Sequence, residues 1–185
     1  CLTLSDGQIT KQQPTPNPNK FHDLESILKQ MSRKKKGSKA FKKLQDLRKN
    51  YIHWTLNQLN LDGVKEVRFE KIWNIGYKQR KSRLLSHWTN TIIRDSFQDY
   101  CFRNGVRFTE VESAYKSQRC FACGLVKKSN RKQKVYKCSC GHVMDADLNS
   151  SKNQMLTLPV ISYEFRKLKL NIKGFYWLES GIFDL

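Results

Sequence analysis

Four cysteines constrain this chain more than any other feature, because they come in two short pairs. Cys120 and Cys123 enclose two residues, Cys138 and Cys140 enclose one, and fourteen residues separate the pairs. This spacing is typical of the two facing knuckles of a zinc ribbon, in which four thiolates close a tetrahedral site. A dispersed disulfide framework would space its cysteines differently, so the pattern favours a reducing compartment. We therefore predict one structural Zn²⁺ on these four thiolates.

The second pair is one residue shorter than a usual knuckle, so its sulfurs have less chain in which to converge. His142 follows two residues later and is an alternative ligand, although an exposed histidine beside a knuckle glycine is the commoner case. Cys1 and Cys101 have no partner at metal-binding spacing. We expect both of them to be buried as small apolar side chains.

The charge of the chain points to a polyanionic partner. Its 185 residues carry 35 Lys and Arg against 16 Asp and Glu, a net charge of +19. Residues 113–144 hold eight Lys and Arg and no acidic residue. Nucleic acid is the first expectation and an anionic membrane the second, since counterion release from phosphates rewards such a surface. The sequence shows neither an apolar run long enough to span a bilayer nor a secretory signal at its first residues, and we expect a cytoplasmic protein.

Hydrophobic periodicity predicts a mixed α/β chain with a separate metal module. A strand and tight turn open the sequence over residues 2–7, and alternate prolines make residues 12–19 extended. The further elements that we expect are helices over 21–31, 39–59 and 81–103, strands over 64–70 and 106–111, the module over 113–144, and a helix from about 145–149. Residues 158–185 are rich in apolar side chains without clean periodicity, and we assign no structure to them.

Two acidic residues stand out in so basic a chain. Glu70 closes a predicted strand, and Asp147 begins a predicted helix just after the cysteine module. A carboxylate beside a phosphate-binding surface repels its ligand unless a divalent cation lies between them, and carboxylates with Mg²⁺ are a common arrangement for phosphodiester hydrolysis. Taken singly, a strand-end glutamate is usually solvated and an aspartate in a first helical turn is usually a cap or dipole partner.

Three segments carry a resemblance to a known family. They are AYKSQRCFACG over 114–124, YKCSCGH over 136–142 and DADLN over 145–149, preceded by VRFEKI over 67–72. Together they resemble the end of the transposon-encoded TnpB nucleases and of the related type V CRISPR effectors, over about residues 1–153. Ser150 and Ser151 stand where the family usually has two alanines.

The resemblance implies an RNase H-like (RuvC) α/β domain, its C-terminal portion, interrupted by an inserted zinc ribbon. Residues 1–111 and 145–185 would be the two nuclease parts, the second with a C-terminal tail, and residues 112–144 the ribbon. Glu70 and Asp147 would be catalytic Mg²⁺ ligands. The family's first catalytic aspartate would lie a few residues upstream of Cys1, and Asp6 in its turn would not replace it, so we expect this chain alone to hold an incomplete site.

The same resemblance implies an RNA-guided DNA endonuclease of prokaryotic, phage or mobile-element origin, whose partners are guide RNA and target DNA. The basic residues expected at nucleic acid are Lys39, Lys42, Lys43, Arg48, Lys116, Arg119, Lys127 and Lys128. A nuclease-dead RNA-guided regulator and a plain zinc-ribbon nucleic-acid-binding module remain as alternatives. The sequence does not determine the oligomeric state.

Overall fold

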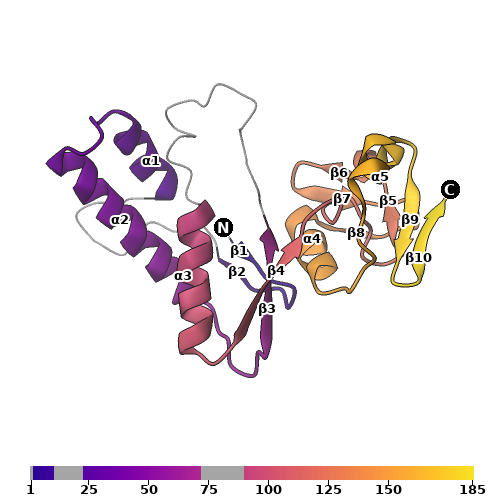
Figure 1. Ribbon diagram of the computed structural model, residues 1–185, viewed down its shortest axis with the longest axis horizontal. Coiled ribbons are helices and arrows are strands. Elements are labelled where there is room, and N and C mark those ends of the chain that lie inside the picture. The colour runs from indigo at the N-terminus through magenta and orange to yellow at the C-terminus, as the bar shows by residue number, and fades with distance from the viewer. Residues whose placement is uncertain (1, 11–22, 72–89) are drawn as a thin grey trace. The chain divides into compact units, whose positions relative to one another are not determined.

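The computed structural model describes residues 2–10, 23–71 and 90–185 and has a mixed α/β architecture (Figure 1). Its N-terminal elements are β1 (Leu2–Thr3), β2 (Ile9–Thr10), α1 (Leu24–Ser32), α2 (Lys39–Leu56), β3 (Glu66–Lys71), α3 (Asn90–Arg103) and β4 (Arg107–Glu112). They are followed by β5 (Leu125–Val126), η2 (Lys128–Asn130), β6 (Arg131–Lys132), β7 (Val135–Lys137), β8 (Val143–Asp145), α4 (Ala146–Gln154), α5 (Tyr163–Lys167), η3 (Leu170–Ile172), β9 (Phe175–Leu178) and β10 (Gly181–Asp184). Cys1, the proline-rich segment and the first part of the helix expected over 81–103 lie outside the described residues.

The described chain forms two compact units. The first contains residues 10, 23–67 and 90–109, and the second contains residues 2–9, 68–71 and 110–185. No helix among the described ranges is long and apolar enough to cross a membrane. The division into two nuclease parts and a ribbon insert stays a prediction, because a compact unit need not coincide with a domain that was inserted as a whole.

The first unit is built on α1, α2 and α3. Ser38 begins α2, where its side chain accepts a hydrogen bond from the backbone N–H of Phe41 over 3.2 Å, as expected of an N-cap. The apolar stripes predicted from the sequence face each other, with Ile27 and Met31 of α1 buried against Phe41 and Tyr51 of α2. Figure 1 shows α1 beside α2, and α2 beside α3.

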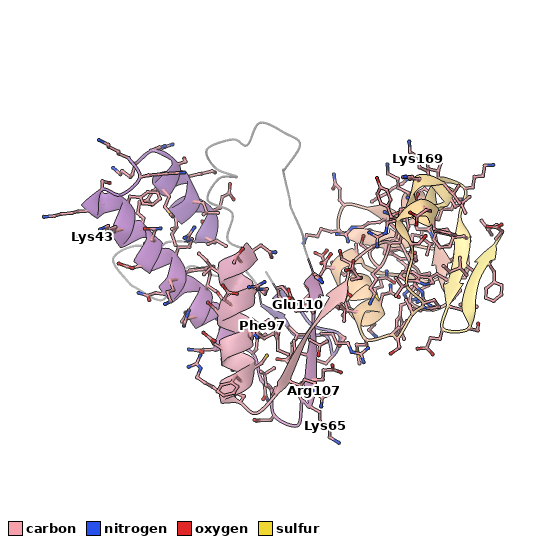
Figure 2. All side chains as sticks on the ribbon, viewed as in Figure 1. Lys43, Lys65, Phe97, Arg107, Glu110 and Lys169 are labelled. Carbon is pink, nitrogen blue, oxygen red and sulfur yellow. The ribbon has the colours of Figure 1, made fainter. Side chains whose placement is uncertain are left out.

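Strands β3 and β4 pair with each other and place Glu70 near the end of its strand. In the first unit, the hydroxyl of Thr109 donates to Oε1 of Glu66 over 2.7 Å, and the ring of Phe108 packs edge-on against Phe97 of α3. Figure 2 labels Phe97 on this helix. The predicted strand over 64–70 is therefore confirmed, with a shift of one or two residues at each end.

The second unit contains both cysteine pairs. Strands β6, β7 and β8 form an antiparallel sheet in which Tyr136 pairs with Arg131 on one side and Met144 on the other. The ring of Tyr136 is fully buried with Cys120, Cys138 and Leu125. Helix α4 starts directly after β8, as the sequence predicted.

The C-terminal residues, which the sequence left unassigned, extend this unit. Strand β9 pairs antiparallel with β5, so that Tyr176 lies opposite Leu125, and β10 pairs with the other edge of β9. Phe175 and Trp177 point to the same buried side, together with Val126 and Ile161. The end of the chain therefore completes the hydrophobic core on which the first cysteine knuckle rests.

Candidate metal and nucleic-acid site

The four predicted zinc ligands converge. The Sγ atoms of Cys120, Cys123, Cys138 and Cys140 all lie within 4.8 Å of one another. Cys120 Sγ is 3.8 Å from Cys140 Sγ, and Cys123 Sγ is 3.6 Å from Cys138 Sγ. Zn–S bonds of about 2.3 Å in a tetrahedron require sulfurs about 3.8 Å apart. The cluster therefore fits one four-coordinate metal ion.

The backbone of each knuckle turns the paired thiols toward one point. The N–H of Gly124 donates to the carbonyl of Cys120 over 2.9 Å, and that of Gly141 to the carbonyl of Cys138 over 3.1 Å. Both glycines have positive φ, +80° and +91°, which a residue with a side chain rarely adopts. The shorter second knuckle closes by the same turn, so the missing residue does not prevent convergence.

His142 supports the second knuckle through its backbone. Its carbonyl accepts a 2.9 Å hydrogen bond from the N–H of Cys138, and its own N–H stabilises the Cys140 thiolate, which lowers the Cys140 pKa to about 7. Among the described residues the metal-ligand cluster consists of the four thiols, with His142 outside it. Cys101 is fully buried, as expected, and burial raises its pKa to about 11.

Asp147 lies in the first turn of α4, held between two basic side chains of the ribbon. Arg131 Nη2 donates to its Oδ1 over 2.7 Å, and Lys134 Nζ to its Oδ2 over 2.9 Å. The preceding Asp145 caps the helix by accepting from the N–H groups of Asp147 and Leu148. Hydrogen bonding to Lys134 and then to Arg131 lowers the Asp147 pKa. Asp145 therefore serves as the cap, and the carboxylate of Asp147 stays free of that role.

Glu70 belongs to the same compact unit as Asp147 and feels its charge. Glu70 is an exposed residue, and partial desolvation by the surrounding protein is the largest cause that raises its pKa. The Ser113 hydroxyl opposes this shift by hydrogen bonding, and Arg131 opposes it by charge, whereas the negative charge of Asp147 raises the pKa further. Carboxylate oxygens are the ligands that a hard divalent cation prefers, and both oxygens of Asp147 are here paired with Arg131 and Lys134.

The predicted basic face of α2 is present in part. Lys39, Lys42 and Lys43 are exposed, and Figure 2 shows Lys43 projecting outward from the helix. Arg48, in contrast, is 7% exposed, so its side chain is not part of this exposed face, and its predicted role at nucleic acid stays a prediction. Arg48 lies seven residues after the buried Phe41 and therefore on the same stripe of the helix.

The ribbon residues predicted to bind nucleic acid divide in the same way. Lys128 is exposed and Lys127 half-buried, so both can reach a ligand. Lys116 is 6% exposed and Arg119 4% exposed, and neither presents its charge to the outer surface. Burial lowers the pKa of Lys116 to about 8, against the opposing attraction of Glu70. Lys116 and Arg119 are therefore buried residues, and their predicted role at nucleic acid stays a prediction.

Arg131 and Lys134 are the two residues that the sequence reasoning missed. Both belong to the acid-free stretch over 113–144, which was treated as uniformly basic. Their distinguishing signal is position, because Arg131 lies in β6 and Lys134 lies in the turn between β6 and β7. Val135, the first residue of β7, pairs with Asp145, which caps α4. Recognising that β7 pairs with β8, the strand that precedes Asp147, would have placed Arg131 and Lys134 beside the Asp147 carboxylate.

Comparisons with known proteins agree with the motifs. The model of the family described as Cas12f1-like, TNB domain, matches residues 93–154. The CRISPR-associated endodeoxyribonuclease Cas12f1 of Sulfoacidibacillus thermotolerans is 28% identical over 105 residues, 56% of this chain and 24% of that protein. A putative transposase, A625R, of Paramecium bursaria Chlorella virus 1 is 29% identical over 129 residues, 64% of this chain and 28% of that protein. The cryo-EM structure of CasPhi-2 (Cas12j) bound to crRNA has a TM-score of 0.53 at 17% identity and covers 68% of this chain and 23% of that one.

The chain is therefore similar to TnpB nucleases and type V CRISPR effectors over these residues, in agreement with its motifs. The likeness to CasPhi-2 concerns the fold, and the family model covers both cysteine pairs and Asp147. The chain spans about a quarter of the length of the curated relatives it matches.

Proposed function

We propose that this chain is the C-terminal nuclease portion of an RNA-guided DNA endonuclease, an RNase H-like (RuvC) domain with an inserted zinc ribbon. The observation that carries the proposal is the placement of Glu70 and Asp147 in one compact unit, which also contains the four-cysteine cluster. They come from a strand end and a helix start far apart in sequence, yet they lie in one compact unit and the charge of one raises the pKa of the other. The same placement argues against a plain zinc-ribbon module, in which Glu70 and Asp147 would have no common role.

Glu70 and Asp147 would hold Mg²⁺, which supplies Lewis-acid stabilisation of the attacking and leaving oxygens of a phosphodiester. Arg131 and Lys134 keep Asp147 ionised and place positive charge where the phosphate of a DNA strand would approach. Strand β1 contacts α4, the helix that carries Asp147.

Zinc would stabilise the ribbon as a structural ion, because the closed set of four thiolates leaves no open coordination position for substrate. Guide RNA and target DNA would be bound through phosphates by exposed or half-buried lysines. Lys39, Lys42 and Lys43 form one group on α2, and Lys127 and Lys128 another at the start of the η2 turn. Such contacts give affinity without sequence information, which base pairing with the guide would supply.

The test uses the complete protein with its guide RNA and a matching DNA. The wild type should cut DNA in Mg²⁺ and not in EDTA, and Glu70→Gln should stop cutting while guided binding persists. Glu112 closes β4 much as Glu70 closes β3, and its carboxylate lies 3.8 Å from Arg166. Glu112→Gln is therefore the matched control and should cut normally. A wild type that binds guided DNA but never cuts would favour the nuclease-dead regulator.

A further inference from the structure

Helix α4, which carries Asp147, is fixed to the rest of its unit by amide side chains. Asn149 and Asn153 are both 0% exposed, and they account for much of the buried surface of a helix with few apolar residues. A buried amide is costly unless its polar atoms are paired. Because hydrogen bonds are directional, a helix held in this way has less freedom to slide or rotate than one held by apolar contacts alone.

The partner of these amides is the first cysteine knuckle. Asn149 donates to the carbonyl of Arg119 over 2.8 Å and accepts from the N–H of Phe121 over 3.1 Å. Asn149 therefore forms hydrogen bonds with both residues that flank Cys120. Asn153 adds donations to the carbonyls of Arg119, over 2.8 Å, and Lys116, over 3.1 Å.

The buried guanidinium of Arg119 extends the connection to the end of the chain. It donates to Oδ1 of Asn153 over 2.7 Å, to the carbonyl of Cys120 over 3.2 Å, and to the carbonyl of Trp177 in β9 over 2.7 Å. One side chain thus joins α4, the knuckle and the C-terminal strand. These three acceptors explain why so basic a residue lies inside the unit.

The first knuckle packs tightly against β9 and Arg119 at Gly124. A Cβ atom added to Gly124 would lie 2.4 Å from the side chain of Leu178, 3.1 Å from the carbonyl of Trp177 and 3.2 Å from Arg119 Nη2. The N–H of Trp177 also donates to the carbonyl of Gly124 over 3.0 Å. The first knuckle, β9 and the Arg119 guanidinium are therefore closely packed against one another.

We propose that Arg119 and Asn153 are positioning residues for the divalent-metal site, because they fix α4 and hence Asp147 relative to the zinc knuckle and β9. The inference rests on the proposed function, in which Asp147 is a metal ligand. A metal ligand must be held to within a fraction of an ångström to bind well. Loss of the residues that orient a ligand commonly weakens metal affinity by about 10-fold or more.

The experiment measures Mn²⁺ affinity by electron paramagnetic resonance, on the complete protein bound to guide RNA and an uncleavable target DNA. Asn153→Ala should bind Mn²⁺ about 10-fold more weakly than the wild type, and Arg119→Lys, which keeps the charge but reaches fewer acceptors, should fall between them. Zinc content and guided DNA binding should be unchanged. Asn171→Ala is the matched control, since it also removes a 2.8 Å amide hydrogen bond, from Asn171 to Oε1 of Gln118, outside this network.

Wild-type Mn²⁺ affinity in zinc-loaded Arg119→Lys would overturn the proposal, even if Asn153→Ala failed to fold. An equal loss of affinity in Asn171→Ala would also overturn it, because the effect would then be a general loss of stability. Glu70→Ala separates this inference from the proposed function. If Glu70→Ala keeps full Mn²⁺ affinity and cuts DNA, the proposed site is wrong, whereas if only Glu70→Ala loses both, the positioning role alone is wrong.

Discussion

Arg131 Nη2 lies 2.7 Å from Oδ1 of Asp147, and the contact links β6 of the ribbon to the first turn of α4. With Lys134 on the other oxygen, it holds the carboxylate in its ionised form. The segment that carries the cysteine cluster therefore also contacts the residue that we place in the active site, because Arg131 and Lys134 lower the Asp147 pKa.

Lys134→Met should raise the pKa of Asp147, because the hydrogen bond to Lys134 is the largest cause of its lowering. A carboxylate whose folded pKa is lowered stabilises the fold above its unfolded pKa, about 3.9 for Asp. The stability difference between wild type and Lys134→Met should therefore be present at neutral pH and disappear as the pH falls through the folded pKa. Carboxyl-carbon NMR titration checks the pKa, and Lys132→Met on β6 is the control.

Glu70→Gln should stabilise the protein at neutral pH in the absence of divalent ions. The Glu70 pKa is raised, first by burial, so the folded state penalises the charged carboxylate. This penalty develops as the pH rises through about 4.3, the usual pKa of Glu, toward the folded value, and it is fully present above that value. Thermal melts of both proteins should separate at pH 7 and coincide in acid. A lower melting temperature for Glu70→Gln than for the wild type at pH 7 would contradict a raised pKa for Glu70.

The zinc content should be one ion per chain, and Cys120→Ser or Cys140→Ser should abolish it. Cys120 and Cys138 belong to the core that buries Tyr136, so loss of the metal should unfold the ribbon. Elemental analysis with circular dichroism before and after chelation checks both points. His142→Ala should retain zinc, because this residue supports the knuckle through its backbone. Loss of zinc in His142→Ala with retention in Cys140→Ser would reverse the ligand assignment.

Neutralising Lys39, Lys42 and Lys43 together should weaken nucleic-acid binding equally for all sequences. The slope of log affinity against log salt should become shallower by about 0.9 for each phosphate that the protein no longer neutralises. Binding of matched and mismatched DNA over a salt series checks this prediction. Neutralising Lys65, Lys169 and Lys173, which are equally exposed, is the control. An unchanged slope would mean that this face of α2 is only solvated.

Much of the fold followed from local patterns, because those patterns have local causes. The knuckles were predicted since cysteine spacing and a glycine determine the turn, and helix α2 was predicted since its apolar residues recur at helical spacing. The burial of Arg48 was not foreseen because a cationic side chain was assumed to face solvent, whereas its position on α2 places it on the apolar stripe.

The contacts between distant segments could not be predicted in this way. The pairing of β9 with β5 depends on residues about fifty positions apart, and nothing in the short run FYWL names its partner. Arg119 was expected at the surface because the sequence does not reveal its hydrogen-bond acceptors. These acceptors are the carbonyls of Cys120 and Trp177 and the side-chain amide of Asn153. Such partners become visible only when the chain is folded.

The most direct test of the central claim compares Asp147→Asn with Asp145→Asn in the complete guided protein. Both variants remove one negative charge at the start of α4, and asparagine at position 145 can still cap the helix. We expect Asp147→Asn to lower the rate of Mg²⁺-dependent DNA cleavage by a factor of about 10³ or more with guided binding intact, and Asp145→Asn to cut normally. Robust cutting by Asp147→Asn, or an equal loss of binding and cutting, would contradict the assignment of Asp147 as a metal ligand.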